Sequence, residues 1–200
     1  MATYPIATAA PLVGITRTRL RAWMNDPEGP CSLDVLPTSG ALLLGFRGLL
    51  EGAVASALLA QRLKPTELRI VVRAARDVFE DDHPLATVRF LEEGEDLVDA
   101  VLPGRPATRS FVRPAGFGSM DHDEAGAPVR WWPRGREGGI LVDPRICSGR
   151  VLEAKSFVPV RALAASVDAE GSIERAAAVW DVEVASVRRA VDFRDLVGPV

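Results

Sequence analysis

Apolar residues recur every three or four positions along much of the chain, which is the period of an α-helix. The clearest stretches are residues 17–24, 46–63 and 66–79. A further short helix is predicted between Pro84 and Gly94, because proline suits the first turn of a helix and glycine the position just past its end. These stretches predict a mainly helical protein.

The first 25 residues predict two short helices joined by a tight turn. Residues 7–12 form the first helix, and Val13-Gly14-Ile15 forms the turn, with Gly14 free to adopt a left-handed conformation. Thr16 suits the cap of the second helix, since its hydroxyl can accept a hydrogen bond from a free backbone N–H. A helix-turn-helix is therefore expected at the N-terminus.

The C-terminal part repeats this kind of pattern. Residues 160–167 and 183–196 have helical periodicity, and Ser172 suits the cap of a helix that runs to about Trp180. A second helix-turn-helix unit is therefore expected near the end of the chain.

The period changes after Gly94, and the middle of the chain predicts strands. Two short strands are expected at residues 96–102 and 107–112, and two more at 129–132 and 139–142. The Pro- and Gly-rich stretch 25–45 is typical of a loop or a short β-wing.

The expected fold class is therefore mainly α with a small antiparallel β element, an α+β protein with helix-turn-helix units at both ends. The boundaries follow the change of period. They give an N-terminal helical DNA-binding domain at 1–95, a small β-sheet linker region at 96–142 and a C-terminal helical domain at 143–200.

Charge is distributed unevenly along a chain whose formal net charge is −3. Residues 1–25 contain three arginines and no acidic residue, whereas the rest of the chain is acidic overall. A protein that coats nucleic acid without sequence preference would be basic throughout. Focused positive charge instead favours the docking of one local element, with the remaining surface available to a protein partner.

The N-terminal helix-turn-helix is the best candidate for DNA binding. Arginine binds guanine edges or phosphates through two hydrogen bonds, and threonines near a helix N-terminus add short donors. From spacing alone, a solvated amphipathic helix is an equally good interpretation. The absence of acid in residues 1–25 favours DNA. The predicted DNA-facing residues are Thr16, Arg17, Thr18, Arg19 and Arg21.

Other polar residues are better explained as structural. Arg188 and Arg189 lie among acidic residues, so the C-terminal unit is expected to pack or dimerise. His83 and His122 each stand beside aspartates, but neither has a second histidine at metal-ligand spacing. The two cysteines are far apart, and we expect packed thiols with no metal site.

Trp131 and Trp132 are adjacent on a predicted strand, so their rings should face opposite sides. Two interpretations are equally good: both rings lie in the core, or one lies in a partner or dimer interface.

No nucleotide-binding, hydrolase or metalloprotease motif occurs, so we expect no enzyme activity and no cofactor. No apolar run is long enough to span a bilayer, and no signal pattern begins the chain. A cytoplasmic location without membrane association is expected.

Several segments in order resemble one family. The stretch from Tyr4 to Trp23, YPIATAAPLVGITRTRLRAW, resembles the helix-turn-helix of MerR-like regulators, and the stretches at 44–51 and 83–94 resemble elements of one subgroup. The tail, from Asp143 to Val191, is similar to a widespread prokaryotic helical domain formerly of unknown function. The combination resembles VapB-type antitoxins with a MerR-like N-terminal domain, over nearly the whole chain. The chain departs from that pattern at Cys147–Gly149 and Ser156–Val160.

The resemblance implies a type II antitoxin that neutralises a PIN-like nuclease toxin and represses its own operon as a homodimer on operator DNA. It places the five residues named above on the DNA. It identifies no toxin-binding residue. Arg134 and Arg136 are one physical hypothesis, since an arginine can occupy the acidic metal site of such a nuclease, although ordinary loop charges explain them as well.

Two alternatives remain open at this point. One is an inhibitor that holds a toxin and never touches DNA. The other is a MerR-like ligand-sensing transcription factor in which residues 97–142 enclose a small molecule.

Overall fold

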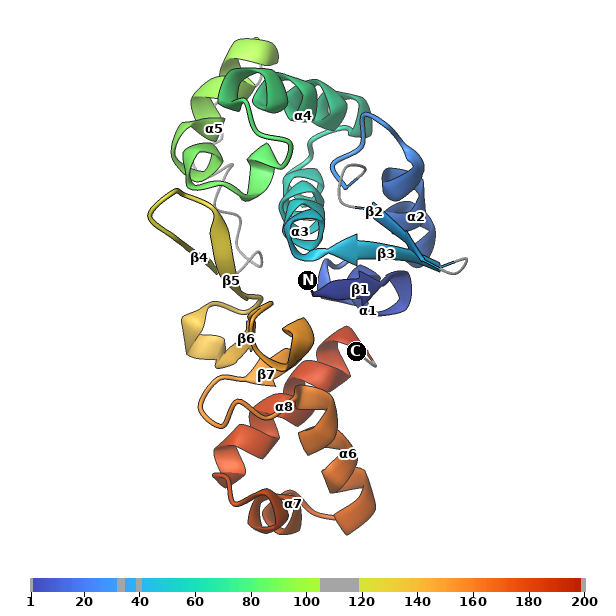
Figure 1. Cartoon of the computed structure of the whole chain (residues 1–200), viewed down its shortest axis with the longest axis vertical. Coiled ribbons are helices and arrows are strands. Elements are labelled where there is room, and N and C mark those ends of the chain that lie inside the picture. Colours follow the sequence, from blue (N-terminus) through green and yellow to red (C-terminus); the bar gives the residue numbers. More distant parts are fainter. Residues whose placement is uncertain (1, 32–34, 39–40, 105–118, 199–200) are drawn as a thin grey trace.

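The computed structural model describes residues 2–31, 35–38, 41–104 and 119–198. Helices predominate in this part of the chain, and its strands form two small antiparallel sheets. The predicted mainly helical α+β class is therefore confirmed. The molecule is elongated, with the N-terminal helices and sheet at one end and the C-terminal helices at the other (Figure 1).

The N-terminal part places a three-stranded sheet beside a helical bundle. The sheet has the order β1-β3-β2, so that β3 pairs with both of its neighbours. Strand β1 precedes the predicted helix-turn-helix in the chain, and β2 and β3 follow it. The pairing of β1 with β3 therefore brings the two ends of that motif together. The elements are β1 (Thr3–Pro5), α1 (Ile6–Leu12), α2 (Arg17–Asn25), β2 (Val35–Thr38), β3 (Ala41–Gly45), α3 (Phe46–Ala60), α4 (Pro65–Phe79), the 3-10 turn η2 (Pro84–Ala86) and α5 (Val88–Val101).

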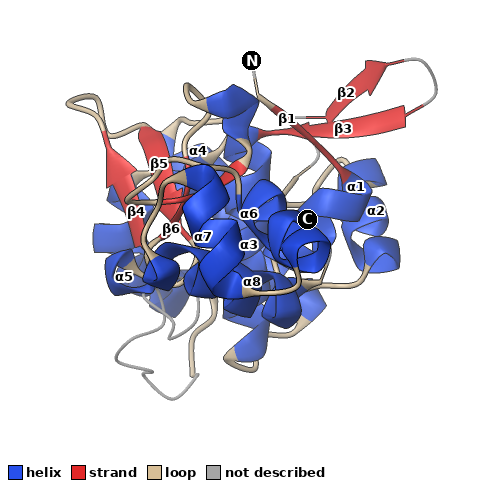
Figure 2. Ribbon diagram, turned by 90° about the horizontal axis from the view of Figure 1, so that it is seen from below, coloured by secondary structure: helices blue, strands red, loops and turns tan. Residues whose placement is uncertain are grey.

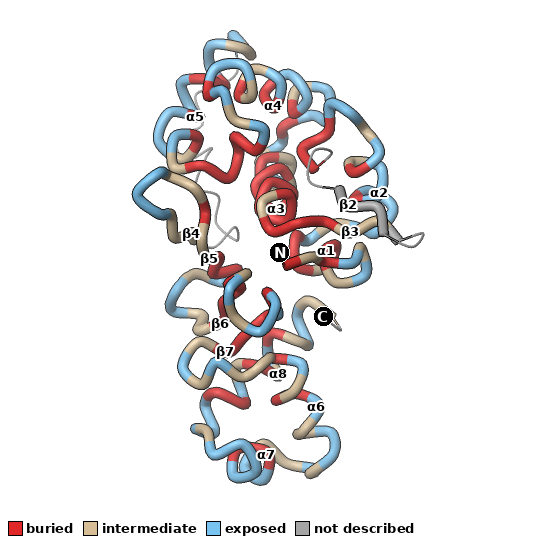
Figure 3. The backbone as a smooth tube through the Cα atoms, in the orientation of Figure 1, coloured by how far each residue is buried: buried red, intermediate tan, exposed pale blue. Residues whose placement is uncertain are grey.

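Helix α3 is the central helix of this part. Its only charged residues are Arg47 and Glu51, and it is buried around nearly its whole circumference (Figure 3). A helix that is apolar on all sides is stable only where other elements cover it. Strand β3 leads directly into α3, and α4 and η2 pack against it.

Helix α5 corrects the sequence analysis. The helix predicted to stop at Gly94 continues to Val101, so the strand predicted at 96–102 is wrong. Leu97 and Val98 are buried at seven and eight positions beyond Phe90, which is the spacing of one helical face. The predicted domain boundary after residue 95 falls inside this helix, and the strand predicted at 107–112 lies outside the described residues.

The second sheet has the order β4-β5-β6-β7. The predicted strands at 129–132 and 139–142 are confirmed as β5 and β6, whereas β4 was not among the predicted strands. The elements are β4 (Ser119–His122), β5 (Pro128–Trp132), η3 (Arg136–Gly138), β6 (Ile140–Val142), η4 (Cys147–Gly149) and β7 (Val151–Glu153).

Three helices complete the chain: α6 (Val160–Glu170), α7 (Ile173–Trp180) and α8 (Val184–Val197). The predicted cap of α7 is confirmed, since the side chain of Ser172 accepts a hydrogen bond from the Arg175 N–H at 3.1 Å. Leu163 of α6 is buried with Val187 and Phe193 of α8. Figure 2 views the molecule from this end and shows the two sheets well apart.

None of the helices in the described ranges combines the length and the apolar character that crossing a bilayer requires.

Candidate nucleic-acid interface and neighbouring sites

The helix-turn-helix predicted at the N-terminus is present as α1, a tight turn and α2. Gly14 has a φ of +73° in the turn, where the Ile15 N–H donates to the Ala10 carbonyl at 3.0 Å. The predicted cap of α2 is confirmed, because the Thr16 hydroxyl accepts from the Arg19 N–H at 3.2 Å. Leu20 and Met24 are buried and fix which face of α2 points outward.

All five residues predicted to face DNA are exposed: Thr16, Arg17, Thr18, Arg19 and Arg21. Within the described part of the chain, none of the three arginines forms an ion pair. Three guanidinium groups are therefore available to a partner from one short helix.

These arginines do not serve the stability of α2 itself. The N-terminal end of a helix carries partial positive charge and is stabilised by acidic side chains. Helix α2 has no acidic residue in its first turn and no basic residue in its last turn. The arginines of α2 therefore add nothing to the stability of the helix through its dipole.

Acidic residues just beyond α2 are paired with arginines of α4. Asp26 accepts from Arg69 at 2.6 Å, and Glu28 pairs with Arg73. These pairs partly neutralise the carboxylates closest in sequence to the exposed arginines. They also tie the end of the helix-turn-helix to the bundle.

Strands β2 and β3 follow α2 and pair antiparallel, with Val35 opposite Leu44. The hairpin projects from the same end of the molecule as α2 (Figure 1). The short β-wing considered for residues 25–45 is thus present as the β2–β3 hairpin.

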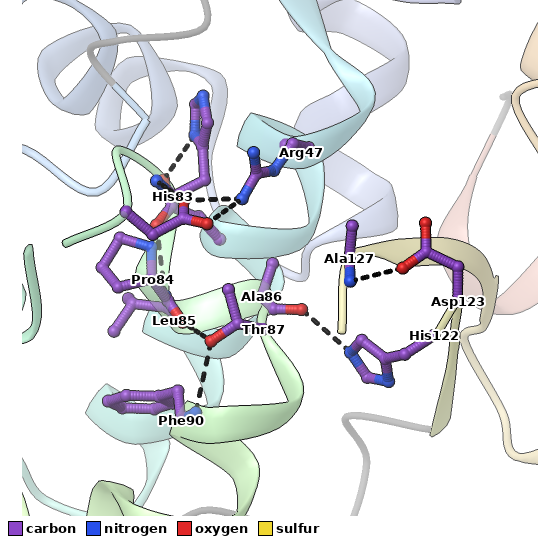
Figure 4. Close-up of polar contacts among 12 residues, drawn as sticks. Arg47, His83, Pro84, Leu85, Ala86, Thr87, Phe90, His122, Asp123 and Ala127 are labelled. Carbon is purple, nitrogen blue, oxygen red and sulfur yellow. Dashed lines mark hydrogen bonds and ion pairs between the residues drawn. The ribbon is translucent and has the colours of Figure 1, made fainter. Parts of the chain in front are cut away.

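Both histidines make contacts within the fold: His83 lies in the N-terminal bundle, and His122 reaches that bundle from β4 (Figure 4). Nδ1 of His83 lies 3.1 Å from Oε2 of the fully buried Glu51, and Nε2 of His122 lies 3.0 Å from the Ala86 carbonyl. Arg47 binds both oxygens of Asp81, at 2.6 and 2.8 Å. Burial raises the pKa of Glu51, against hydrogen bonds from His83 and the Leu85 N–H that lower it.

No group of three potential ligands for a metal ion occurs among the described residues. Neither histidine cluster therefore has the ligands of a metal centre.

The C-terminal arginines have different environments. Arg189 binds Glu153, which is fully buried on β7, and it also donates to the Ser186 hydroxyl at 3.0 Å. Arg188 is exposed. Only one of the two is thus available to a partner, in keeping with the expectation that this unit packs against the rest of the chain.

The two residues of the toxin hypothesis also differ. Arg136 pairs with Asp121, and its guanidinium lies 5.3 Å from the centre of the Trp132 ring. Arg134 is exposed on a groove of about 810 Å³ that separates α1 and α3 from α8. Arg136 is thus held by Asp121, whereas Arg134 is not.

Both tryptophans are buried, and they lie in separate clusters. Trp131 belongs to the main core, whereas Trp132 packs with Leu141 and Leu152. The Trp132 indole N–H donates to Asp121 at 3.2 Å. Of the two interpretations, the one with both rings in the interior of the chain is correct.

The fold is similar to that of a solved protein. The X-ray crystal structure of Rv2018 from Mycobacterium tuberculosis superposes with a TM-score of 0.78, over 94% of this chain and 97% of that chain. The two sequences are 18% identical, so this similarity concerns the fold alone. No protein-family model matches the sequence, and no curated protein matches it.

Proposed function

We propose that this chain is a DNA-binding regulator that contacts operator DNA through α2 and the β2–β3 hairpin. The single observation that carries the proposal is the set of exposed arginines on α2, which have no carboxylate partner within the described residues and no role in stabilising their own helix.

Helix α2 has the features that a recognition helix needs. It is short, it is fixed to α1 by buried Leu20 and Met24, and it presents Arg17 and Arg21 one turn apart on its outer face. A helix of this kind enters the major groove, where its arginines can contact phosphates and base edges. The hairpin beside it would follow the adjacent DNA backbone as a wing.

Two copies are required for tight operator binding. Regulators with this motif bind two half-sites about one helical turn apart, and the symmetry of the operator mirrors that of the dimer. We therefore expect a homodimer, which analytical ultracentrifugation of the free and DNA-bound protein would measure.

The test uses DNA from upstream of the chain's own gene. The Arg17→Ala, Arg21→Ala double variant should bind this DNA about a hundredfold more weakly, because each lost contact costs roughly 1–3 kcal/mol. The matched control is the Arg175→Ala, Arg188→Ala double variant, which removes two exposed arginines from the C-terminal helices. Equal DNA affinity of both variants, measured by fluorescence anisotropy, would remove α2 from the interface.

We further propose that the regulator is a type II antitoxin whose partner is a PIN-like nuclease. Support comes from the sequence resemblance and from large apolar side chains left in water at and next to the α7–α8 turn. Val179, Trp180 and Val184 are between 38% and 63% exposed. Apolar side chains grouped on a surface are typical of a protein contact.

The antitoxin role is tested by co-expression with the nuclease encoded beside the gene. We expect the two proteins to co-purify and the nuclease to be inactive in the complex. A Val179→Ser, Trp180→Ser variant should lose the complex and keep DNA binding, since α2 lies at the other end of the molecule.

Arg134→Ala tests the toxin hypothesis for that residue, with Arg136→Ala as its comparison. Inhibition of the nuclease without any DNA binding would favour the pure inhibitor.

A further inference from the structure

The segment directly after α2 is held by arginines of α4. Arg69 donates to one carboxylate oxygen of Asp26 through Nε at 2.9 Å and through Nη2 at 2.6 Å. The Asp26 side chain is only 21% exposed, so this ion pair is partly shielded from water. Arg73 lies one helical turn further along α4 and pairs with Glu28. Two ion pairs thus join the segment to α4, where the chain after α2 reaches that helix (Figure 1).

Arg76 extends this row on the same face of α4, three positions beyond Arg73. Its Nη2 donates to the Gly29 carbonyl at 2.9 Å. Burial raises the pKa of Glu51 on α3, and the positive charge of Arg76 opposes this rise. Arg76 therefore links the segment after α2 to a buried charge inside the bundle.

The segment is in turn tightly joined to the last turn of α2. The Gly29 N–H donates to the Asp26 carbonyl at 2.8 Å, and the Glu28 N–H donates to Oδ1 of Asp26 at 3.1 Å. A Cβ added to Gly29 would clash with the Trp23 carbonyl oxygen, so the segment folds back closely against the helix. Any displacement of the segment therefore moves the end of α2 with it.

Apolar packing alone defines the tilt of α2 weakly. Only Leu20 and Met24 of its nine residues are buried, and its main packing partner among the described helices and strands is α1. Burial of apolar surface has no preferred direction, whereas a charge-assisted hydrogen bond has a defined geometry. The contacts with α4 thus give the last turn of α2 a second attachment, and this one is directional.

We propose that three arginines of α4 are positioning residues: by holding residues 26–29, they set the angle at which α2 presents its own arginines to DNA. They are Arg69, Arg73 and Arg76. The proposal rests on the proposed DNA-binding function and names the part of the bundle that orients the recognition helix. Sequence is read through hydrogen bonds to base edges, whereas phosphate contacts carry no sequence information directly. Loss of the attachment should therefore weaken operator binding more than binding to unrelated DNA.

The alternative is that the α4 arginines contact the DNA backbone themselves. The two explanations predict opposite effects of Asp26→Ala on operator affinity. A positioning role predicts binding about fivefold weaker, the equivalent of one ion pair, although the variant removes a negative charge. Direct contact predicts tighter binding, because Arg69 becomes free to neutralise a phosphate. Unchanged or tighter binding by Asp26→Ala overturns the proposal.

Asp77→Ala is the matched control. Asp77 is exposed on α4 and forms no ion pair with any residue that the structure describes. Its loss removes the same charge from the N-terminal bundle, so operator affinity should equal or exceed that of the wild type. An equal fall in Asp26→Ala and Asp77→Ala overturns the proposal.

The double variant Asp26→Ala, Arg69→Ala separates positioning from charge, because it removes the ion pair and leaves the net charge unchanged. Well below its unfolding temperature, it should bind the operator about fivefold more weakly than the wild type and should bind unrelated DNA of equal length unchanged. Equal losses on both DNAs overturn the proposal, since they indicate a lost phosphate contact or a partly unfolded protein.

Hydrogen exchange tests the attachment without DNA. In the free Asp26→Ala protein, the amides of Trp23, Met24 and Asn25 should exchange faster than in the wild type, whereas those of α7 should not change. A wild type that binds no operator would overturn the proposed function, and the exchange rates then decide on the attachment by themselves. Unchanged exchange in the last turn of α2 overturns the attachment.

Discussion

Nη2 of Arg189 on α8 lies 2.5 Å from Oε1 of Glu153 on β7, and the Glu153 side chain has no exposed surface. The same carboxylate accepts from the N–H and the hydroxyl of Ser156, at 2.8 and 2.7 Å. These hydrogen bonds and the ion pair lower the pKa of Glu153 against the effect of burial, which raises it. An ion pair whose carboxylate is fully buried thus joins the last helix, α8, to the second sheet.

Loss of this ion pair should destabilise the fold. Arg189→Ala leaves a buried carboxylate without its counter-charge, which costs about 3 kcal/mol in the free energy of unfolding. The neighbouring Arg188→Ala removes an exposed arginine and should cost less than about 0.5 kcal/mol. Urea unfolding of both variants measures the difference. Similar losses in both would show that the ion pair contributes nothing beyond a surface charge.

Gly149 should be sensitive to a single added methyl group. Its φ is +77°, and an added Cβ would lie 2.4 Å from the Tyr4 hydroxyl and 2.5 Å from the Ala2 side chain. Gly171 has a similar φ of +73° with nothing within 4 Å, so Gly171→Ala isolates the backbone strain. We expect Gly149→Ala to cost about 2 kcal/mol more than Gly171→Ala, the typical effect of overpacking. Thermal unfolding that ranks the two variants equally would contradict this contact.

Asp143 should govern part of the acid sensitivity. Hydrogen bonds from Arg145 and Arg130 lower the pKa of this carboxyl from 3.8 to about 2. A lowered folded-state pKa stabilises the protein above the unfolded-state value, and this contribution is lost as the pH falls from about 4 to about 2. The gap in unfolding temperature between wild type and Asp143→Asn should therefore narrow over that range. A gap that is constant from pH 6 to pH 2.5 would contradict the prediction.

The two outer arginines of α2 should respond differently to salt. Arg17 lies in the first turn, where the helix N-terminus attracts phosphate, so Arg17→Ala should reduce the slope of log affinity against log salt by about one. Arg21 lies one turn further on and is expected to contact a base edge, so Arg21→Ala should reduce discrimination against altered operators. Titrations between low and moderate salt measure the slope, and titrations with altered operators measure the discrimination. An unchanged slope in Arg17→Ala would remove its proposed phosphate contact.

The local signals in the sequence were sufficient for the capped helices. Thr16 and Ser172 each act within three residues, so the starts of α2 and α7 follow from the chain itself. The start of α4 was placed slightly late, because the predicted stretch begins at residue 66, whereas the structure uses Lys64 as the cap and Pro65 in the first turn. The exposed arginines of α2 also followed from periodicity, since Leu20 and Met24 fix the opposite face.

Gly94 shows where local signals fail. A glycine followed by Leu97-Val98 resembles the end of a helix and the start of a strand, but α5 continues through it. Phe90, Leu97 and Val98 are buried together in the bundle. Packing of that face outweighs the preference of one glycine, which costs only about 1 kcal/mol in a helix.

The sequence alone determined the helical class, the helix-turn-helix units and the residues of α2 that face outward, because each depends on spacing or hydrogen bonds within a few positions. Only the tertiary structure decided which charges are paired and which are free. Glu153 and Arg189 are 36 residues apart, and so are Ala86 and His122. A cavity lined by Tyr4 of β1 and Arg161 of α6 likewise exists only because these two elements meet, and no local pattern encodes that meeting.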